Sequence, residues 1–138
     1  MKTTDRPSFT AVVTSCALGI VLWGAVILIA SYSGCAKADD WNDSDRALYA
    51  ATVALDAVDW SQTRRAGALG YVEHNPLIDV GNAGQVNRYF IATPILQYLI
   101  ADALPGSVRP WFLGASLAVE VGSVAHNRHV GLSVRLGL

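Results

Sequence analysis

Residues 48–63, LYAATVALDAVDWSQT, decide the fold that this sequence predicts. The stretch is apolar almost all round, except at positions i, i+4, i+7 and i+11, which are Thr52, Asp56, Asp59 and Thr63. Because an α-helix has about 3.6 residues per turn, these four side chains form one narrow stripe along a helix. Two carboxylates on an otherwise apolar helix need polar neighbours. The stretch therefore predicts a helical bundle with a polar interior.

The composition indicates a membrane protein. Of the 138 residues, 52% are hydrophobic and 15% are charged, whereas an ordinary soluble domain has about 25% charged residues. The formal net charge of −1 and the scattered arginines argue against nucleic-acid binding. Cys16 and Cys35 lack C-x-x-C spacing, which excludes a disulfide scaffold. We expect an all-α fold, a small integral membrane helical bundle of three to four transmembrane helices.

Residues 1–38 are predicted to form an N-terminal transmembrane anchor or a signal segment. Residues 11–32 contain no charged residue and are long enough to cross a hydrocarbon core of about 30 Å as a helix. The sequence that follows leaves three alternatives open. The segment is retained as an anchor, it is cleaved after Ala38 at an A-x-A site, or Cys35 is lipidated at a lipobox in which Tyr32 replaces the usual aliphatic residue.

Residues 39–138 are predicted to form a three-helix membrane bundle with a polar interior. Hydrophobic periodicity and the breaker residues place its helices at 46–64, 88–104 and 110–127. Pro94 is expected near the first turns of the second helix, where a helix tolerates proline. The cap of the first helix is expected to be one of Asp43, Ser44 and Asp45.

The second and third of these helices carry polar stripes of their own. The stripes consist of Tyr89, Thr93 and Gln97 on one helix and of Ser116, Glu120, Ser123 and Asn127 on the other. We expect the stripes to face one another, because a polar group that faces lipid is costly. Several carboxyls in one low-dielectric space cannot all stay ionised without a proton, a metal ion or an arginine. The interior candidates are Asp56, Asp59, Thr63, Gln97 and Glu120.

A second group of candidates surrounds the loop YVEHNP. The group consists of Glu73, His74, Asn75, His126 and Asn127. Asp59, Glu73, His74 and His126 are of the residue types that bind zinc or another divalent metal. No H-x-x-x-H or H-E-x-x-H spacing supports such a site, and the alternative is a capped turn with histidines at the membrane interface. We therefore predict no cofactor, with a divalent metal as the alternative. Catalytic residues are not predicted, because no G-x-S-x-G turn or phosphate-binding loop is present.

Four short motifs carry a resemblance to a known group of proteins. They are D-W-S-Q-T at 59–63, Y-V-E-H-N-P at 71–76, V-N-R-Y-F at 86–90, and V-E with H-N within 119–127. The sequence from 48 to 131 resembles a group of small uncharacterised membrane proteins of bacteria and their phages, which share a D-x-x-Q-T helix and an E-x-N-P loop. The resemblance implies an integral membrane α-helical protein. It implies no activity.

The function that the sequence favours is a structural or interaction role in a bacterial inner membrane, and an enzyme is disfavoured. The basic residues place both termini in the cytoplasm if the first segment is retained. The expected partners are the lipid bilayer and either another membrane protein or a second copy of the chain. Three alternatives stay open: a proton- or ion-handling protein, a metal-dependent membrane enzyme at the cytoplasmic face, and a holin-like phage lysis protein.

Overall fold

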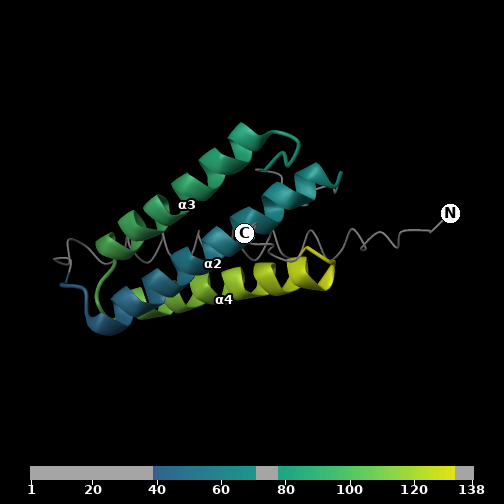
Figure 1. Cartoon of the computed structure of the whole chain (residues 1–138). Helices are drawn as coiled ribbons and strands as arrows, with labels where there is room; N and C mark the ends of the chain where they lie inside the picture. The colour runs from purple at the N-terminus through teal and green to yellow at the C-terminus, as the bar shows by residue number, and fades with distance from the viewer. Residues whose placement is uncertain (1–38, 71–77, 133–138) are drawn as a thin grey trace, which may run out of the picture. The chain divides into compact units, whose positions relative to one another are not determined.

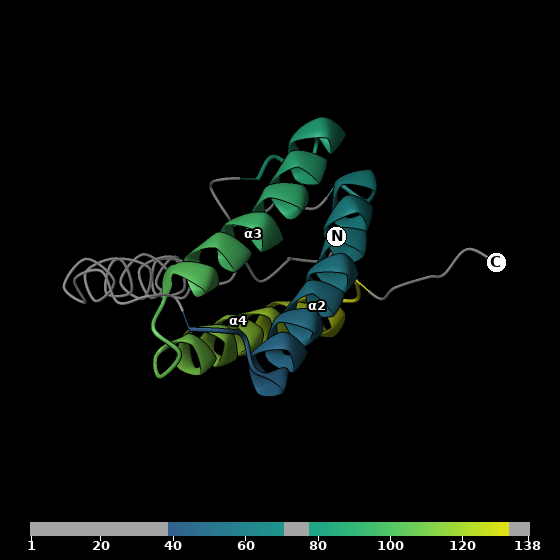
Figure 2. The same ribbon diagram turned by 90° about the vertical axis from the view of Figure 1, so that its left-hand side faces the viewer.

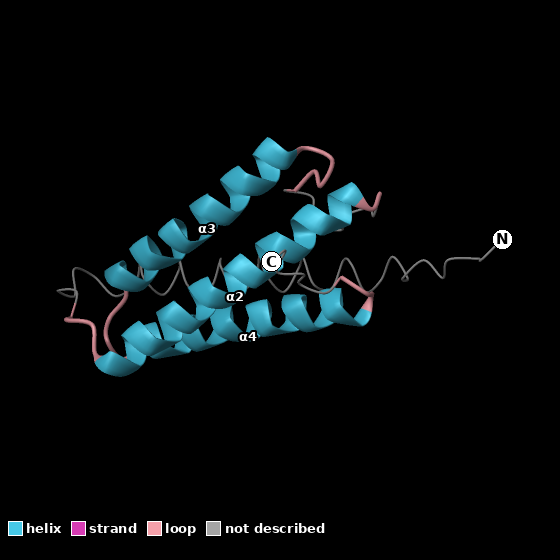
Figure 3. Cartoon of the chain, viewed as in Figure 1, coloured by secondary structure: helices cyan, strands magenta, loops and turns pink. Residues whose placement is uncertain are grey.

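The computed structural model describes residues 39–70 and 78–132. This part of the chain contains three helices and no strand, in the order α2 (Asp43–Ala68), α3 (Ala83–Ala103) and α4 (Arg109–His129) (Figures 1 and 3). It belongs to the second of two compact units, Cys35–Leu138. The predicted all-α class and helical bundle are confirmed. The expected anchor or signal segment and the candidate lipidation site at Cys35 lie outside the described residues.

A capping box starts α2 earlier than predicted. The side chain of Asn42 accepts a hydrogen bond from the backbone N–H of Asp45 at 2.9 Å. The carboxylate of Asp45 accepts one from the backbone N–H of Asn42 at 3.4 Å. Reciprocal bonds of this kind satisfy two amide donors that the first turn leaves without partners. The cap is therefore Asn42, and the prediction of Asp43, Ser44 or Asp45 was wrong.

Helix α3 contains a proline in its middle. The side chain of Asn82 accepts a hydrogen bond from the backbone N–H of Gln85 at 3.1 Å, so the helix begins at Ala83. Pro94 consequently lies well inside α3, and the prediction that it lies near the first turns was wrong. Because proline has no N–H, it cannot donate to the carbonyl one turn earlier. The carbonyl of Pro94 itself accepts a hydrogen bond from the hydroxyl of Tyr49 at 3.1 Å, which joins α3 to α2 at this level.

Helix α2 contacts both α3 and α4, whereas α3 and α4 contact each other little. Figure 2 shows α2 beside each of the other two helices. Near the end of α2, Gly67 lies close to the backbone of Val80, in the turn before α3. A Cβ on Gly67 would lie 2.9 Å from the carbonyl carbon of Val80. A small apolar cluster of Ile78, Val86 and Phe90 lies at this end.

The bundle buries polar side chains beside apolar ones. The buried apolar residues include Val86, Leu104 and Leu113, and the buried polar residues are Asp45, Thr52, Asp56, Gln62, Thr63, Gln97 and Arg109. Other large apolar side chains are exposed, with exposed fractions of 63% for Ile91, 58% for Leu99 and 81% for Trp111. Within residues 39–70 and 78–132, no helix combines the length and the apolar character that a membrane crossing needs.

Candidate functional site

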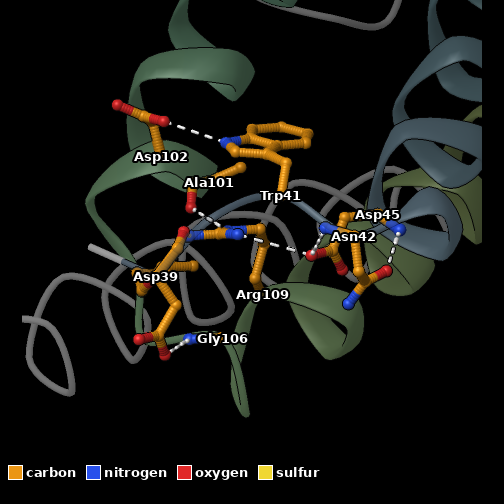
Figure 4. Close-up of polar contacts among 9 residues, drawn as sticks. Asp39, Trp41, Asn42, Asp45, Ala101, Asp102, Gly106 and Arg109 are labelled. Atoms are coloured by element: carbon orange, nitrogen blue, oxygen red, sulfur yellow. Dashed lines mark hydrogen bonds and ion pairs between the residues drawn. The ribbon is translucent and has the colours of Figure 1, made fainter.

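Arg109 joins all three helices at one end of the bundle. Its side chain is fully buried. Its Nε donates to the carbonyl of Ala101 at 2.9 Å, and one terminal nitrogen donates to the carbonyls of Asp39 at 2.7 Å and Leu104 at 3.2 Å. The other terminal nitrogen lies 3.4 Å from the carboxylate of Asp45. Figure 4 shows this guanidinium between the start of α2 and the turn from α3 to α4.

Trp41 covers the guanidinium. The centre of the Arg109 group lies 5.1 Å from the centroid of the Trp41 ring, within the range of a cation–π interaction. The indole N–H donates to the carboxylate of Asp102 at 2.9 Å, and the ring stacks on Tyr98 at a centroid distance of 5.2 Å. The Arg109 clamp is the name used below for Asp39, Trp41, Asp45, Asp102 and Arg109. All of these contacts hold the backbone and the helices together, so the clamp is structural.

The sequence prediction missed the clamp, because it used the basic residues, Arg109 among them, only to infer the membrane topology. One local signal was present. The N-terminus of a helix carries partial positive charge, so an arginine at the first position of α4 is unfavourable without a specific acceptor. Such a position indicates a buried anionic or carbonyl partner. The partner itself, Asp45, lies far away in the sequence.

Two long-range contacts fix how α4 lies along α2. At one end Arg109 pairs with Asp45, and further along Asn127 donates to the carboxylate of Asp59 at 2.5 Å. The two helices therefore run in the same direction. Between these contacts lie Asp56 on α2 and Glu120 on α4. The three predicted acids of the interior therefore lie along the same stretch of the α2 and α4 helix pair.

The name central carboxyl pair is used below for Asp56 on α2 and Glu120 on α4. Asp56 is only 3% exposed, and its Oδ2 is buried without a hydrogen-bond partner among the described residues. The same holds for the Oε2 of Glu120. No ion pair of either residue occurs in the part of the chain that the structure covers. A buried oxygen without a donor is costly. Among the described residues, Asp45, Gln62 and Gln97 also each have one such oxygen.

Gln97 is buried, but it lies at a different level along the bundle from Asp56. The contacts of Tyr49 with Pro94 and of Trp41 with Asp102 show that α2 and α3 run in opposite directions. Gln97 therefore lies nearer to the Arg109 clamp than Asp56 does. Its Oε1 is also buried without a partner. The structure separates Gln97 from the central carboxyl pair.

The other candidates have varied surroundings. Thr63 is buried near the end of α2, Asn127 is half-buried against Asp59, and His126 is exposed. Glu73, His74 and Asn75 lie outside the described residues. Within those residues, no group of three or more His, Cys, Asp or Glu side chains is arranged to hold a metal ion. The metal site that would include Glu73 and His74 stays a prediction.

A groove of about 380 Å³ lies between α2 and α3 beside Asp56. Its walls come from Val53, Asp56, Ala57, Trp60, Asn87, Phe90, Ile91 and Pro94. At one end of the groove the indole N–H of Trp60 donates to the side chain of Asn87 at 2.9 Å. The groove is mainly apolar, and Asp56 is the ionisable residue in its wall.

Comparison with protein-family models, with curated proteins and with solved structures finds no match for this chain.

Proposed function

We propose that this chain is a small integral protein of the bacterial inner membrane with a structural or interaction role, and that the apolar outer face of its helical bundle contacts lipid. The polar side chains buried inside the bundle and the large apolar side chains exposed on its outside support this proposal. Polar side chains that face one another inside a bundle satisfy their hydrogen bonds, and apolar side chains on its outside match acyl chains. The resemblance to small membrane proteins of bacteria and phages points the same way.

The clearest support for a lipid contact is an apolar surface on the outer face of α3. Ile91, Ile95 and Leu99 follow one another at i, i+4 and i+8, and each is more than half exposed. This spacing places them on one side of the helix. Contiguous apolar surfaces of this kind on a protein mark a contact with another protein or with a membrane. The nearby groove, with its mainly apolar walls, suits an acyl chain in the same way.

A nitroxide at position 95 tests the lipid contact. The chain is prepared in bilayers with Cys16 and Cys35 changed to Ser and with Ile95→Cys, and the label's collisions with molecular oxygen and with a water-soluble nickel complex are measured. Oxygen concentrates in lipid, whereas the nickel complex stays in water. The matched control carries the label at Asp79→Cys, an exposed position in the turn before α3.

The proposal predicts that the label at 95 collides with oxygen and not with nickel, and that the label at 79 collides more with nickel. A label at 95 that collides freely with nickel would show that the face meets water and would refute the proposal. Low collision rates with both reagents would show protein contact, which assigns the face to a partner protein or a second copy instead of lipid.

The intact mass of the full chain from isolated inner membranes decides between the three alternatives for residues 1–38. The mass of the unprocessed chain indicates a retained anchor. The mass of a chain that begins at Asp39 indicates cleavage after Ala38. An added diacylglyceryl mass that disappears with Cys35→Ser indicates lipidation.

A further inference from the structure

The groove between α2 and α3 is built from one face of each helix. The residues that line it on α2 lie at positions i, i+3, i+4 and i+7 from Val53 to Trp60, and those on α3 follow the same spacing from Asn87 to Pro94. This spacing places side chains on one side of a helix. The volume of about 380 Å³ lies within the range of about 300–1,000 Å³ that is usual for pockets that bind small molecules. The groove is therefore large enough for a small ligand with an apolar body.

Asp56 gives the groove a negative charge that no described residue neutralises. The residue lines the groove and is 3% exposed. Within residues 39–70 and 78–132, no hydrogen bond or ion pair to its carboxylate occurs. Arg64, about two turns further along α2, donates instead to the carbonyl of Ala83 and to the side chain of Asn87. Because a buried charge without a partner is costly, the groove favours a ligand that carries a positive charge.

A backbone acceptor lies beside the same groove. Pro94 has no N–H, so the carbonyl of Phe90, one turn earlier in α3, lacks the donor that residue 94 of a regular helix would supply. The ring of a helical proline points toward that carbonyl, and both residues line the groove. A primary ammonium group has three N–H donors and no acceptor. It can therefore bind a carboxylate and a free carbonyl at the same time.

Trp60 adds an aromatic ring to the same wall. It lies one turn after Asp56 on the same face of α2, and its indole N–H donates to the side chain of Asn87 at 2.9 Å. The faces of indole rings attract cations. The contact with Asn87 ties this ring to α3, so the ring is held at the groove before a ligand binds.

We propose that the groove between α2 and α3 binds a hydrophobic primary ammonium ion, whose charged head pairs with the carboxylate of Asp56 and whose apolar body lies along Val53 and Phe90. A neutral or anionic ligand with the same body would leave the charge of Asp56 without a partner, so this charge selects the class of ligand. The proposal goes beyond the structural role proposed above, because it assigns a ligand to the chain.

Fluorine NMR of the full chain in a neutral detergent tests the proposal. The protein is labelled with 5-fluorotryptophan, and the signal of Trp60 is identified by its loss in Trp60→Phe. The signal of Trp41, which lies in the Arg109 clamp, reports whether the bundle stays folded. Octylammonium, octanol and octanoate are titrated separately, because they share the apolar chain and differ in the charge of the head group.

Two variants separate the charge of the groove from its shape. Asp56→Asn removes the charge and keeps the shape, and its control is Asp43→Asn, since Asp43 is a fully exposed aspartate on the same helix. Ala57→Leu fills part of the groove and keeps the charge. Its control is Ala54→Leu, because Ala54 is an exposed alanine of α2 that does not line the groove.

The proposal predicts that octylammonium shifts the Trp60 signal in a saturable way and leaves the Trp41 signal unchanged. Its affinity is expected to exceed that of octanol and octanoate by about tenfold or more, as a hydrogen-bonded charge predicts. Asp56→Asn is expected to abolish this preference, and Ala57→Leu is expected to weaken binding of octylammonium. The two control variants are expected to bind like the wild type.

The proposal is overturned if no saturable shift occurs, if the preference survives in Asp56→Asn, or if Ala57→Leu binds as well as Ala54→Leu. Octanol that binds as tightly as octylammonium would also overturn it and assign the groove to neutral acyl chains. If Asp56→Asn disturbs the Trp41 signal, Ala57→Leu and the comparison of the three probes in the wild type decide. These outcomes do not depend on what surrounds the label at position 95, so failure of one proposal is distinguishable from failure of the other.

Discussion

The guanidinium of Arg109 lies 3.4 Å from the carboxylate of Asp45, and neither side chain has any exposed surface. A buried ion pair is weak evidence for stability, because both charges lose their hydration. Here the guanidinium also satisfies three carbonyls, and the carboxylate completes the capping box of α2. The main role of the pair is therefore to fix the geometry of this end of the bundle, and its Coulomb energy is less important.

Arg109→Met is expected to lower the free energy of unfolding by about 3–5 kcal/mol, because it leaves the charge of Asp45 buried without a partner. Unfolding of the full chain in mixed detergents measures the change. Arg46→Ala is the control, since Arg46 forms an exposed ion pair with Asp43 on the surface of α2. An Arg109→Met variant as stable as the Arg46→Ala variant would show that the clamp does not hold the helices.

Gly67→Ala is expected to destabilise the bundle by about 1–3 kcal/mol, because the new methyl group overlaps the carbonyl of Val80 and forces the backbone apart. Gly122→Ala on α4 provides the control, since nothing lies within 4 Å of a Cβ there. That change is expected to be neutral or to add up to about 1 kcal/mol through helix propensity. Equal effects of the two substitutions in the same unfolding assay would contradict the close approach at Gly67.

Asn127→Ala removes the side-chain amide that donates to Asp59. The free energy of unfolding is expected to fall by about 1–3 kcal/mol, because a partly buried carboxylate loses a donor. The neighbouring His126 is exposed, so His126→Ala is expected to have little effect. If His126→Ala proves the more damaging change, the histidine has a role that the described contacts do not show.

Burial of Asp56 and Glu120 makes stability depend on pH. Each has one buried oxygen without a donor among the described residues, and burial disfavours the ionised form of a carboxyl. The folded chain therefore binds protons that the unfolded chain releases at the same pH, and the free energy of unfolding falls as the pH rises. We expect the wild type to lose stability from acidic to alkaline pH and the Asp56→Asn variant to lose less, because only one buried carboxyl remains. Parallel pH profiles of the two proteins would contradict this effect of burial on Asp56.

The sequence predicted the helices and the inward position of Asp56 because both follow from local periodicity. The same reasoning misplaced the helix ends, since Asn42 and Asn82 cap them through backbone contacts that periodicity does not encode. It also missed the Arg109 clamp, whose partners Asp45 and Asp39 lie 64 and 70 residues away. Pairing over such distances is set by the packing of helices, which a single sequence does not reveal.

Glycine gives a further example. Gly114 and Gly122 lie inside a predicted helix, where a small residue favours close packing, whereas Gly67 lies after the predicted end of its helix at residue 64. The structure shows the reverse. A Cβ added at Gly67 would lie within 4 Å of neighbouring atoms, whereas a Cβ added at Gly114 or Gly122 would not. Which small residue lies at a contact depends on the rotation of each helix about its axis.

The two contacts that hold α4 against α2 span 64 and 68 residues, and this has a consequence for biosynthesis. The ribosome makes α2 long before it makes Arg109 and Asn127. During that interval the carboxylates of Asp45 and Asp59 have no partner on α4. A nascent chain that stops before Arg109 therefore lacks both the guanidinium that Asp45 contacts and the amide that Asp59 contacts in the finished protein.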